Sequence, residues 1–126
     1  MIELAGIHRD FLVGEQTVHA LDDVNLRIED GEYVSIMGPS GSGKSTLLNL
    51  IGLLDRPNAG HYYLNGKDVT THDDAAQAQV RNHEIGFVFQ MFHLVQRLTA
   101  AENIELPMMM AGIPAAERSA RVNRVL

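Results

Sequence analysis

The sequence predicts an α/β fold in which antiparallel strands come first, a strand–loop–helix unit second and further helices last. Alternating apolar residues between positions 2 and 28 are typical of half-buried strands. A glycine-rich loop at residues 38–46 separates an apolar, strand-like run from a helix-like one. Beyond residue 54, turn signals alternate with short strand and helix patterns. This order predicts an antiparallel β segment joined to a loop-bearing α/β core.

The elements up to residue 54 follow from local patterns. A polar turn with one glycine, at residues 13–16, joins the first strand to the next. The apolar residues of 24–28 alternate with polar ones, and a turn at 29–32 leads into the strand before the loop. The leucine-rich run after Lys44 indicates a buried helix. The expected elements are strands over 2–7, 18–21, 24–28 and 32–37, and a helix over 44–54.

The second half of the chain has clearer start and stop signals. Asn65-Gly66 is typical of a tight hairpin turn. Thr71 or Asp73 is expected to cap a polar helix, and Thr99 with Glu102 has the spacing of a capping box. The compact apolar run at 85–89 suits a buried strand. The expected elements are strands over 61–64 and 85–89, and helices over 73–82, from 99 to about 112, and over 115–126.

Composition narrows the class of protein. The 126 residues include 10 Lys plus Arg against 16 Asp plus Glu, a net charge of −6, which argues against non-specific nucleic-acid binding. Cysteine is absent, which excludes a disulfide framework and a thiolate metal site. The N-terminus lacks the pattern of a signal peptide, and no apolar run is long enough to span a bilayer. We expect one soluble, cytoplasmic domain.

The glycine-rich loop matches the pattern G-x-x-x-x-G-K-[ST] in full. Glycines let the backbone turn its N–H groups toward a polyphosphate, and Lys44 would reach the β- and γ-phosphates. Ser45 would ligate Mg²⁺, and Thr46 begins the helix whose positive end faces the anion. The strand before the loop and the helix after it are the context that this motif requires. The predicted phosphate-binding residues are Gly38, Pro39, Ser40, Gly41, Ser42, Gly43, Lys44, Ser45 and Thr46.

Three stretches carry a resemblance to a known family: Ser35–Asn49, Gly86–Leu94 and Leu98–Pro107. Together they resemble the N-terminal half of the nucleotide-binding domain of ABC transporters, over essentially the whole chain. The third stretch is similar to the subgroup that includes macrolide exporters and lipoprotein-release systems. The resemblance implies a P-loop NTPase core with an N-terminal antiparallel β subdomain. Residues 1–98 would form the N-terminal part of that core, and 99–126 the beginning of an incomplete helical subdomain.

The resemblance also implies roles for residues outside the loop. Phe11 stands where the family usually has a tyrosine that stacks on adenine, and Val18 would pack beside the base. Gln90 stands where the family's glutamine contacts Mg²⁺ and the attacking water, before a segment that touches the membrane subunit. The implied catalytic residues are therefore Lys44 and Gln90, as a partial site, and the implied metal ligands are Ser45 and Gln90.

ATP and Mg²⁺ are the cofactors that the resemblance implies, and ATP hydrolysis coupled to transport is the family's reaction. The implied partners are a transmembrane subunit and a second nucleotide-binding domain that shares two ATP molecules, at the cytoplasmic face of the inner (plasma) membrane. The family's Leu-Ser-Gly-Gly-Gln signature, its acidic catalytic strand and its switch histidine do not occur in these 126 residues. We therefore expect a truncated chain that folds marginally and does not hydrolyse ATP alone.

Several alternatives remain open from the sequence. A nucleoside monophosphate kinase carries a similar loop, although directly after its first strand, whereas 37 residues precede Gly38 here. A soluble family member acting on DNA or translation, or a non-functional fragment, would also fit. Phe11 alone would be read as a core aromatic, the methionines at 108–110 as core filling, and the arginines at 118, 121 and 124 as a solvated helix face.

Overall fold

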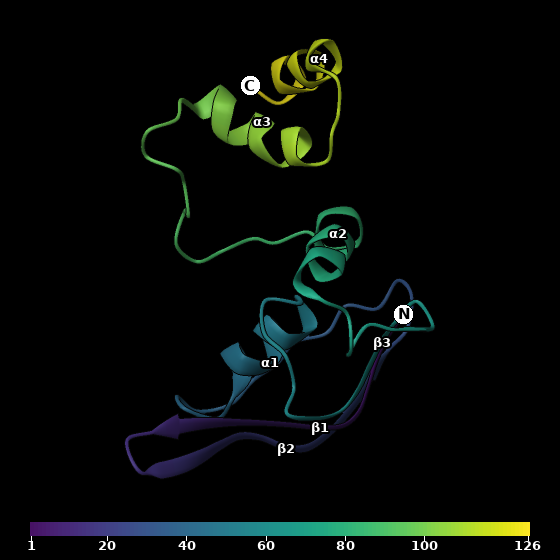
Figure 1. The fold of residues 1–126 in the computed structure, drawn as a ribbon, viewed down its shortest axis with the longest axis vertical. Coiled ribbons are helices and arrows are strands. Elements are labelled where there is room, and N and C mark those ends of the chain that lie inside the picture. Colours follow the sequence, from purple (N-terminus) through teal and green to yellow (C-terminus); the bar gives the residue numbers. More distant parts are fainter. The chain divides into compact units, whose positions relative to one another are not determined.

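The computed structural model describes residues 1–126, which form two compact units, Met1–Ala78 and Gln79–Leu126 (Figure 1). The first unit holds a sheet and helix α1 (Lys44–Ile51), and the second holds helices α3 (Ala100–Met110) and α4 (Ala115–Val125). Helix α2 (Asp74–Glu84) begins in the first unit and ends in the second. None of these helices has the length and hydrophobicity of a membrane-spanning segment.

One antiparallel sheet of four strands organises the first unit, with the spatial order β2-β1-β3-β4. The hairpin pairing between the first two strands runs from Ile2 opposite Ile28 to Val13 opposite Gln16. The first strand is therefore longer than predicted, and the two strands predicted over 18–21 and 24–28 form one. The pairing with β1 resumes on both sides of residues 22 and 23, with shifts of register, so one irregular strand replaces the two predicted ones. The strands are β1 (Ile2–Val13), β2 (Gln16–Ile28), β3 (Ala59–Leu64) and β4 (Lys67–Asp68).

A β-bulge interrupts this hairpin near its middle. Arg9 pairs with Leu21, whereas the next residue of β1, Asp10, pairs with His19. Ala20 is therefore an extra residue on β2. A bulged residue is left out of the regular ladder and bends its strand, so β2 changes direction at Ala20.

The core of the first unit lies between the sheet and α1, which Figure 1 shows beside the strands. Tyr62 of β3 is the largest fully buried side chain, with 1% of its surface exposed. Its hydroxyl donates a hydrogen bond of 2.8 Å to the carbonyl oxygen of Ile51, at the end of α1. Burial and this bond attach the helix to the sheet. The other buried apolar residues of this core are Leu4, Ile7, Leu21, Leu50, Leu53, Leu64 and Val69.

Replacing Tyr62 by phenylalanine is expected to lower the free energy of unfolding by about 1–3 kcal/mol, because the Ile51 carbonyl loses its donor. Burial raises the pKa of Tyr62 from 10.0 to about 12. The neutral phenol is thus favoured in the folded state, so its contribution is complete below pH 10 and is lost as the pH rises through 12. Urea melts between pH 8 and about 12 check this. Identical pH dependence in wild type and Tyr62→Phe would contradict the assignment.

Two predicted strands, over 32–37 and 85–89, are not part of the sheet, and this prediction is wrong for the structure. Tyr33 and Val88 are almost fully exposed. Apolar runs of this kind become strands in parallel sheets, where neighbouring strands supply the hydrogen bonds and helices cover both faces. The sheet here is antiparallel throughout, and neither run pairs with it. Without that ladder, both runs stay irregular.

Helix α1 is shorter and less buried than predicted. It ends at Ile51, and the N–H of Gly52 donates to the carbonyl of Leu48. Leu50 is its only buried residue, because one face packs on the sheet and the opposite leucines are left uncovered. Helix α2 begins after Asp73, whose carboxylate accepts a 2.8 Å bond from the N–H of Ala76. Of the two caps that the sequence allowed, Thr71 and Asp73, the structure therefore uses Asp73.

The second unit confirms the predicted capping box. The Glu102 N–H donates to the Thr99 hydroxyl, and the Glu102 carboxylate accepts from the Thr99 N–H at 2.7 Å. The Thr99 donors hold the pKa of Glu102 below its usual value. Arg118 is not the solvated residue expected, because it joins α4 to α3 through a 2.6 Å ion pair with Glu105. A local helix pattern could not show this partner, which comes from another helix.

Candidate functional site

The glycine-rich loop bends through two left-handed residues just before α1. Gly41 has φ 80° and Gly43 has φ 84°, a conformation that side chains with a Cβ rarely adopt. Between them, the Ser42 N–H donates to the carbonyl of Pro39 at 3.3 Å and closes a turn. The predicted loop therefore forms a tight bend, and its exposed residues 38–42 leave it open to solvent on one side.

Gly43 lies directly against the bulge of β2. A Cβ at this position would be 2.4 Å from the Ala20 carbonyl oxygen and 3.3 Å from the Leu21 side chain. The same construction at Gly41 meets nothing within 4 Å. One end of the loop thus packs against the bulge of the sheet, and only glycine fits where Gly43 meets Ala20.

Helix α1 begins immediately after this contact, and its N-terminus faces the loop. Gly43 is the N-cap and has no side chain to accept from the first-turn N–H groups, and no acidic residue lies in that turn. Uncapped N–H groups and the positive end of a helix attract anions such as phosphates. The Ser45 side chain is exposed, and Thr46 is half-buried in the same turn.

Lys44 places its positive charge inside the bend of the loop. Its ammonium donates to the carbonyl oxygens of Gly38, at 2.8 Å, and Pro39, at 2.5 Å. A third, longer contact of 3.3 Å reaches the Ser42 hydroxyl. All three partners are neutral oxygens of the loop itself. A phosphate entering the loop would therefore offer this cation a charged acceptor in place of neutral ones.

The residues of the glycine-rich loop and of the first turn of α1 fit a nucleoside triphosphate. The cradle has a lysine, two left-handed glycines and a free helix N-terminus at one place, as phosphate binding requires. No group of three or more His, Asp or Glu side chains is positioned to hold a metal ion. A Mg²⁺ ion would therefore depend on phosphate oxygens and on the exposed Ser45 hydroxyl for much of its coordination.

Phe11 and Val18 lie directly opposite each other on β1 and β2. Their exposed fractions are 38% and 47%, so Phe11 is not the core aromatic that the residue alone would indicate. Directly opposed side chains in an antiparallel pair are close neighbours. The two residues predicted for the base thus form one exposed apolar surface on the β1–β2 hairpin, and β2 also contacts Gly43.

Gln90 belongs to the second unit, whereas all the other predicted site residues belong to the first. It is exposed and follows Phe87 and Phe89, whose rings stack with their centroids 5.2 Å apart. The Phe89 ring also meets the edge of His93 at 4.4 Å. The loop and the Phe11–Val18 pair thus belong to the same unit, whereas Gln90 belongs to the other and is exposed next to an aromatic cluster in the chain.

Sequence reasoning missed Arg9 and Asp55 beside the base surface. The guanidinium carbon of Arg9 lies 4.4 Å from the centroid of the Phe11 ring. Two hydrogen bonds of 2.8 Å tie the same guanidinium to the Asp55 carboxylate. The spacing of Arg9 and Phe11 along one strand would place them on one face, which is a signal for Arg9. Asp55 is 46 positions from Arg9 along the chain, so no local sequence pattern could indicate their pairing.

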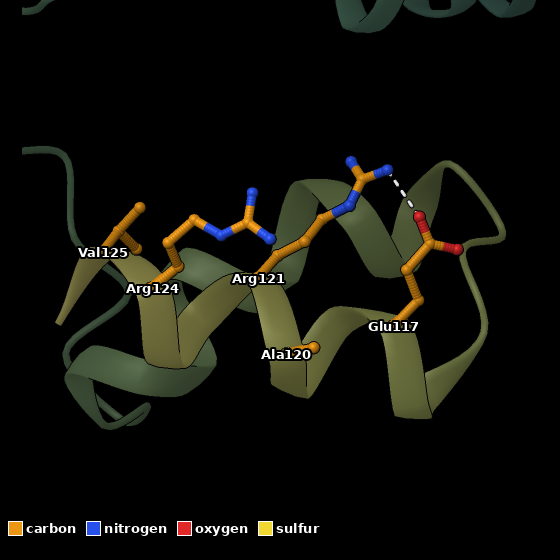
Figure 2. Close-up of a pocket in the computed structure, with 5 residues that line it drawn as sticks. All are labelled: Glu117, Ala120, Arg121, Arg124 and Val125. Atoms are coloured by element: carbon orange, nitrogen blue, oxygen red, sulfur yellow. Dashed lines mark hydrogen bonds and ion pairs between the residues drawn. The ribbon is translucent and has the colours of Figure 1, made fainter.

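A hollow elsewhere on the surface has no part in this site. Figure 2 shows that its lining residues all come from one face of α4, where Arg121 donates to the Glu117 carboxylate at 2.5 Å. A surface formed by one helix does not enclose a ligand. None of the predicted site residues lines it.

Comparison with known proteins places the chain among nucleotide-binding proteins. The family model described as ABC transporter matches residues 21–126. The uncharacterised ABC transporter ATP-binding protein YknY of Bacillus subtilis strain 168 is 51% identical over 126 residues, which are all of this chain and 55% of that protein. The macrolide export ATP-binding/permease protein MacB of Shewanella sp. (strain W3-18-1) is 50% identical over 124 residues, which are 98% of this chain and 19% of MacB.

A solved structure agrees with these relatives. The dimeric, post-hydrolysis state of the ATP-binding cassette MJ0796 with ADP and Pi superposes with a TM-score of 0.90 at 44% identity, over 98% of this chain and 55% of that one. The chain therefore spans about half the length of YknY and of the MJ0796 cassette, and about a fifth of MacB. The resemblance read from the sequence is confirmed, and the family match favours it over the monophosphate kinase alternative.

Proposed function

We propose that this chain, which belongs to the ABC transporter family, supplies the ATP-binding part of a transporter for export or lipoprotein release. The observation that carries the proposal is the position of Lys44, whose ammonium is held by loop oxygens at the open end of α1. A mobile lysine or a capped helix would not prepare a site for a triphosphate. Relatives named for ATP binding and macrolide export support the same function.

Each part of the site has a separate task in this proposal. The Lys44 ammonium and the backbone N–H groups of residues 38–46, apart from Pro39, which has none, would bind the β- and γ-phosphates. Phe11 offers a flat apolar face to the adenine, with Val18 beside it. Because stacking recognises any base by its face, GTP is expected to compete within about tenfold of ATP.

Mg²⁺ would be held by the Ser45 hydroxyl and by Gln90, together with phosphate oxygens. When bound, such an ion would supply positive charge to offset the negative charge that develops as the γ-phosphoryl group is transferred to water. Gln90 would contact the ion and position the attacking water through its neutral amide. Lys44 and Gln90 are thus the catalytic residues of the proposal, and they form only part of a complete hydrolytic site.

Two partners follow from the relatives. MacB is named as a joined ATP-binding and permease protein, and the MJ0796 cassette is described as dimeric. We therefore infer a transmembrane subunit as one partner and a second nucleotide-binding domain as the other. The working place would be the cytoplasmic face of the inner membrane, and no nucleic acid is expected as a partner because the chain is acidic.

Titration of the chain with ATP, in Mg²⁺ and in EDTA, tests the proposal. Saturable binding that tightens with Mg²⁺ is expected. Ser45→Ala is expected to keep the affinity measured in EDTA and to lose most of the Mg²⁺ enhancement, about 1.5–3 kcal/mol for a charge-assisted contact. Ser40→Ala is the control, because Ser40 lies outside the fixed positions of the motif and alanine keeps the backbone N–H through which it would contact the phosphates.

Two outcomes would contradict these statements separately. Absence of saturable ATP binding at millimolar concentration by wild type would remove the proposed function. An unchanged Mg²⁺ enhancement in Ser45→Ala, or an equal loss in Ser40→Ala, would remove only Ser45 as the metal ligand.

A further inference from the structure

Arg9 is one of the most firmly held side chains near the site. Its Nε and Nη2 donate to the two carboxylate oxygens of Asp55, each at 2.8 Å, and only 22% and 25% of the two side chains are exposed. Nη1 makes longer contacts to the Asn58 side-chain oxygen, 3.3 Å, and the Asp10 carbonyl, 3.4 Å. A bidentate arginine–carboxylate pair fixes the plane of the guanidinium as well as its position.

The anchor comes from the turn that follows α1. Asn58 donates its N–H to the His8 carbonyl and accepts from the Asp10 N–H, both at 2.8 Å. The pairing of β1 with β3 ends where His8 lies opposite Ala59. The two bonds of Asn58 extend the contact with β1 by one residue beyond that pairing. The turn at 55–58 is therefore fastened to β1 beside Arg9, and Asp55 cannot shift without breaking several bonds.

The fixed guanidinium lies over one face of Phe11. Its carbon is 4.4 Å from the ring centroid, within the range of a cation–π contact. The hairpin tip beyond the ring is open, since Leu12 and Val13 are largely exposed. Phe11 has no hydroxyl with which to fix its own orientation. The arginine is thus the contact that holds the ring from one side while part of it faces solvent.

We propose that Arg9 is a positioning residue for the nucleotide base, and that it holds the Phe11 ring from one side so that the base stacks on the other. The proposal rests on the proposed function, which places the base on Phe11. The ring then lies between the guanidinium and the base. Arg9 itself touches neither base nor phosphate, so it affects only ligands that carry a base.

The test compares two ligands on each variant of the chain: Mg·ATP, and Mg·tripolyphosphate, which lacks base and sugar. Arg9→Gln is expected to weaken ATP binding about three- to tenfold and to leave tripolyphosphate affinity within about twofold. Asp55→Asn keeps the arginine charge but weakens its anchor, and is expected to shift ATP affinity in the same direction by less. Arg27→Gln is the control, because Arg27 lies on β2 in an exposed ion pair with Glu29.

A double-mutant cycle with Phe11→Ala separates positioning from a general effect on folding. If Arg9 acts through the ring, Arg9→Gln is expected to cause no further loss of ATP affinity once Phe11 is alanine. A structural role would instead weaken both ligands equally in Arg9→Gln, and would overturn the proposal. Asp55→Asn decides the same question if Arg9→Gln does not fold.

The remaining outcomes are also decisive. Unchanged or tighter ATP binding in Arg9→Gln and Asp55→Asn would show that Arg9 does not support the ring, or covers the face that the base needs. A wild type that binds neither ligand would fail the proposed function. If wild type binds both ligands and the variants show no selective loss of ATP affinity, only the role of Arg9 is disproved.

Discussion

Replacing Lys44 by alanine is expected to weaken Mg·ATP binding by about one to two orders of magnitude. The ammonium already lies in the bend of the loop, against the carbonyls of Gly38 and Pro39. Loss of a charge-assisted contact costs about 1.5–3 kcal/mol, which is roughly a tenfold to 150-fold change in affinity. Stability should change little, because the loop carbonyls are exposed and water can replace the lysine. Calorimetric titration measures the affinity, and a thermal melt measures the stability.

The chain offers a matched control for charge. Lys67 is the only other lysine, and its side chain is exposed on strand β4 of the same unit. Lys67→Ala removes the same charge and should leave ATP affinity within about twofold, because separated surface charges are screened by salt. Equal binding by wild type and Lys44→Ala, or an equal loss in Lys67→Ala, would disprove the assignment of Lys44 to the phosphates.

Gly43→Ala is expected to produce the largest combined effect, on loop geometry and on stability. The left-handed backbone at φ 84° disfavours alanine by about 1–2 kcal/mol. The new Cβ would also lie 2.4 Å from the Ala20 carbonyl oxygen, a backbone atom that cannot rotate away, and such overpacking costs about 1–3 kcal/mol more. The loop must leave its seat on β2 to relieve the contact, so ATP binding should fall together with the melting temperature.

Gly41→Ala separates the two causes. Gly41 has nearly the same φ, 80°, but a Cβ there meets nothing within 4 Å. Its loss of stability should match the backbone cost alone, and Gly43→Ala should exceed it by the cost of the contact. Urea unfolding of both variants measures the difference. Equal destabilisation would mean that the contact with Ala20 does not hold the loop.

Elements with local signals were predicted well. Asn65 and Gly66 both have positive φ, 51° and 77°, as a tight hairpin turn requires. Thr99 with Glu102, and Asp73, cap their helices through bonds to residues three positions away. Such interactions are encoded within a few residues, so the sequence shows them directly.

Elements that depend on distant partners were predicted poorly. The runs at 32–37 and 85–89 have strand composition, but a strand exists only where another strand accepts its hydrogen bonds. The bulge at Ala20 left no mark in the sequence, because it depends on how β1 and β2 slip past each other. The site divides in the same way: the loop was predicted from its spacing, whereas the Arg9–Asp55 pair joins residues from two separate segments.

The bulge at Ala20 fixes the distance along β2 between the Phe11–Val18 surface and the glycine-rich loop. Strand β2 meets the base surface at Val18 and the loop at Ala20, two residues further on, which is a separation of about 7 Å along a strand. In the proposed function, this short segment of backbone would therefore set the distance between the base and the phosphates. Inserting or deleting one residue here would alter that distance and turn one of the two contacts to the opposite face of the sheet. The hairpin tip at residues 13–16 lies outside this segment, so we expect a change in its length to leave the proposed nucleotide selectivity unaltered.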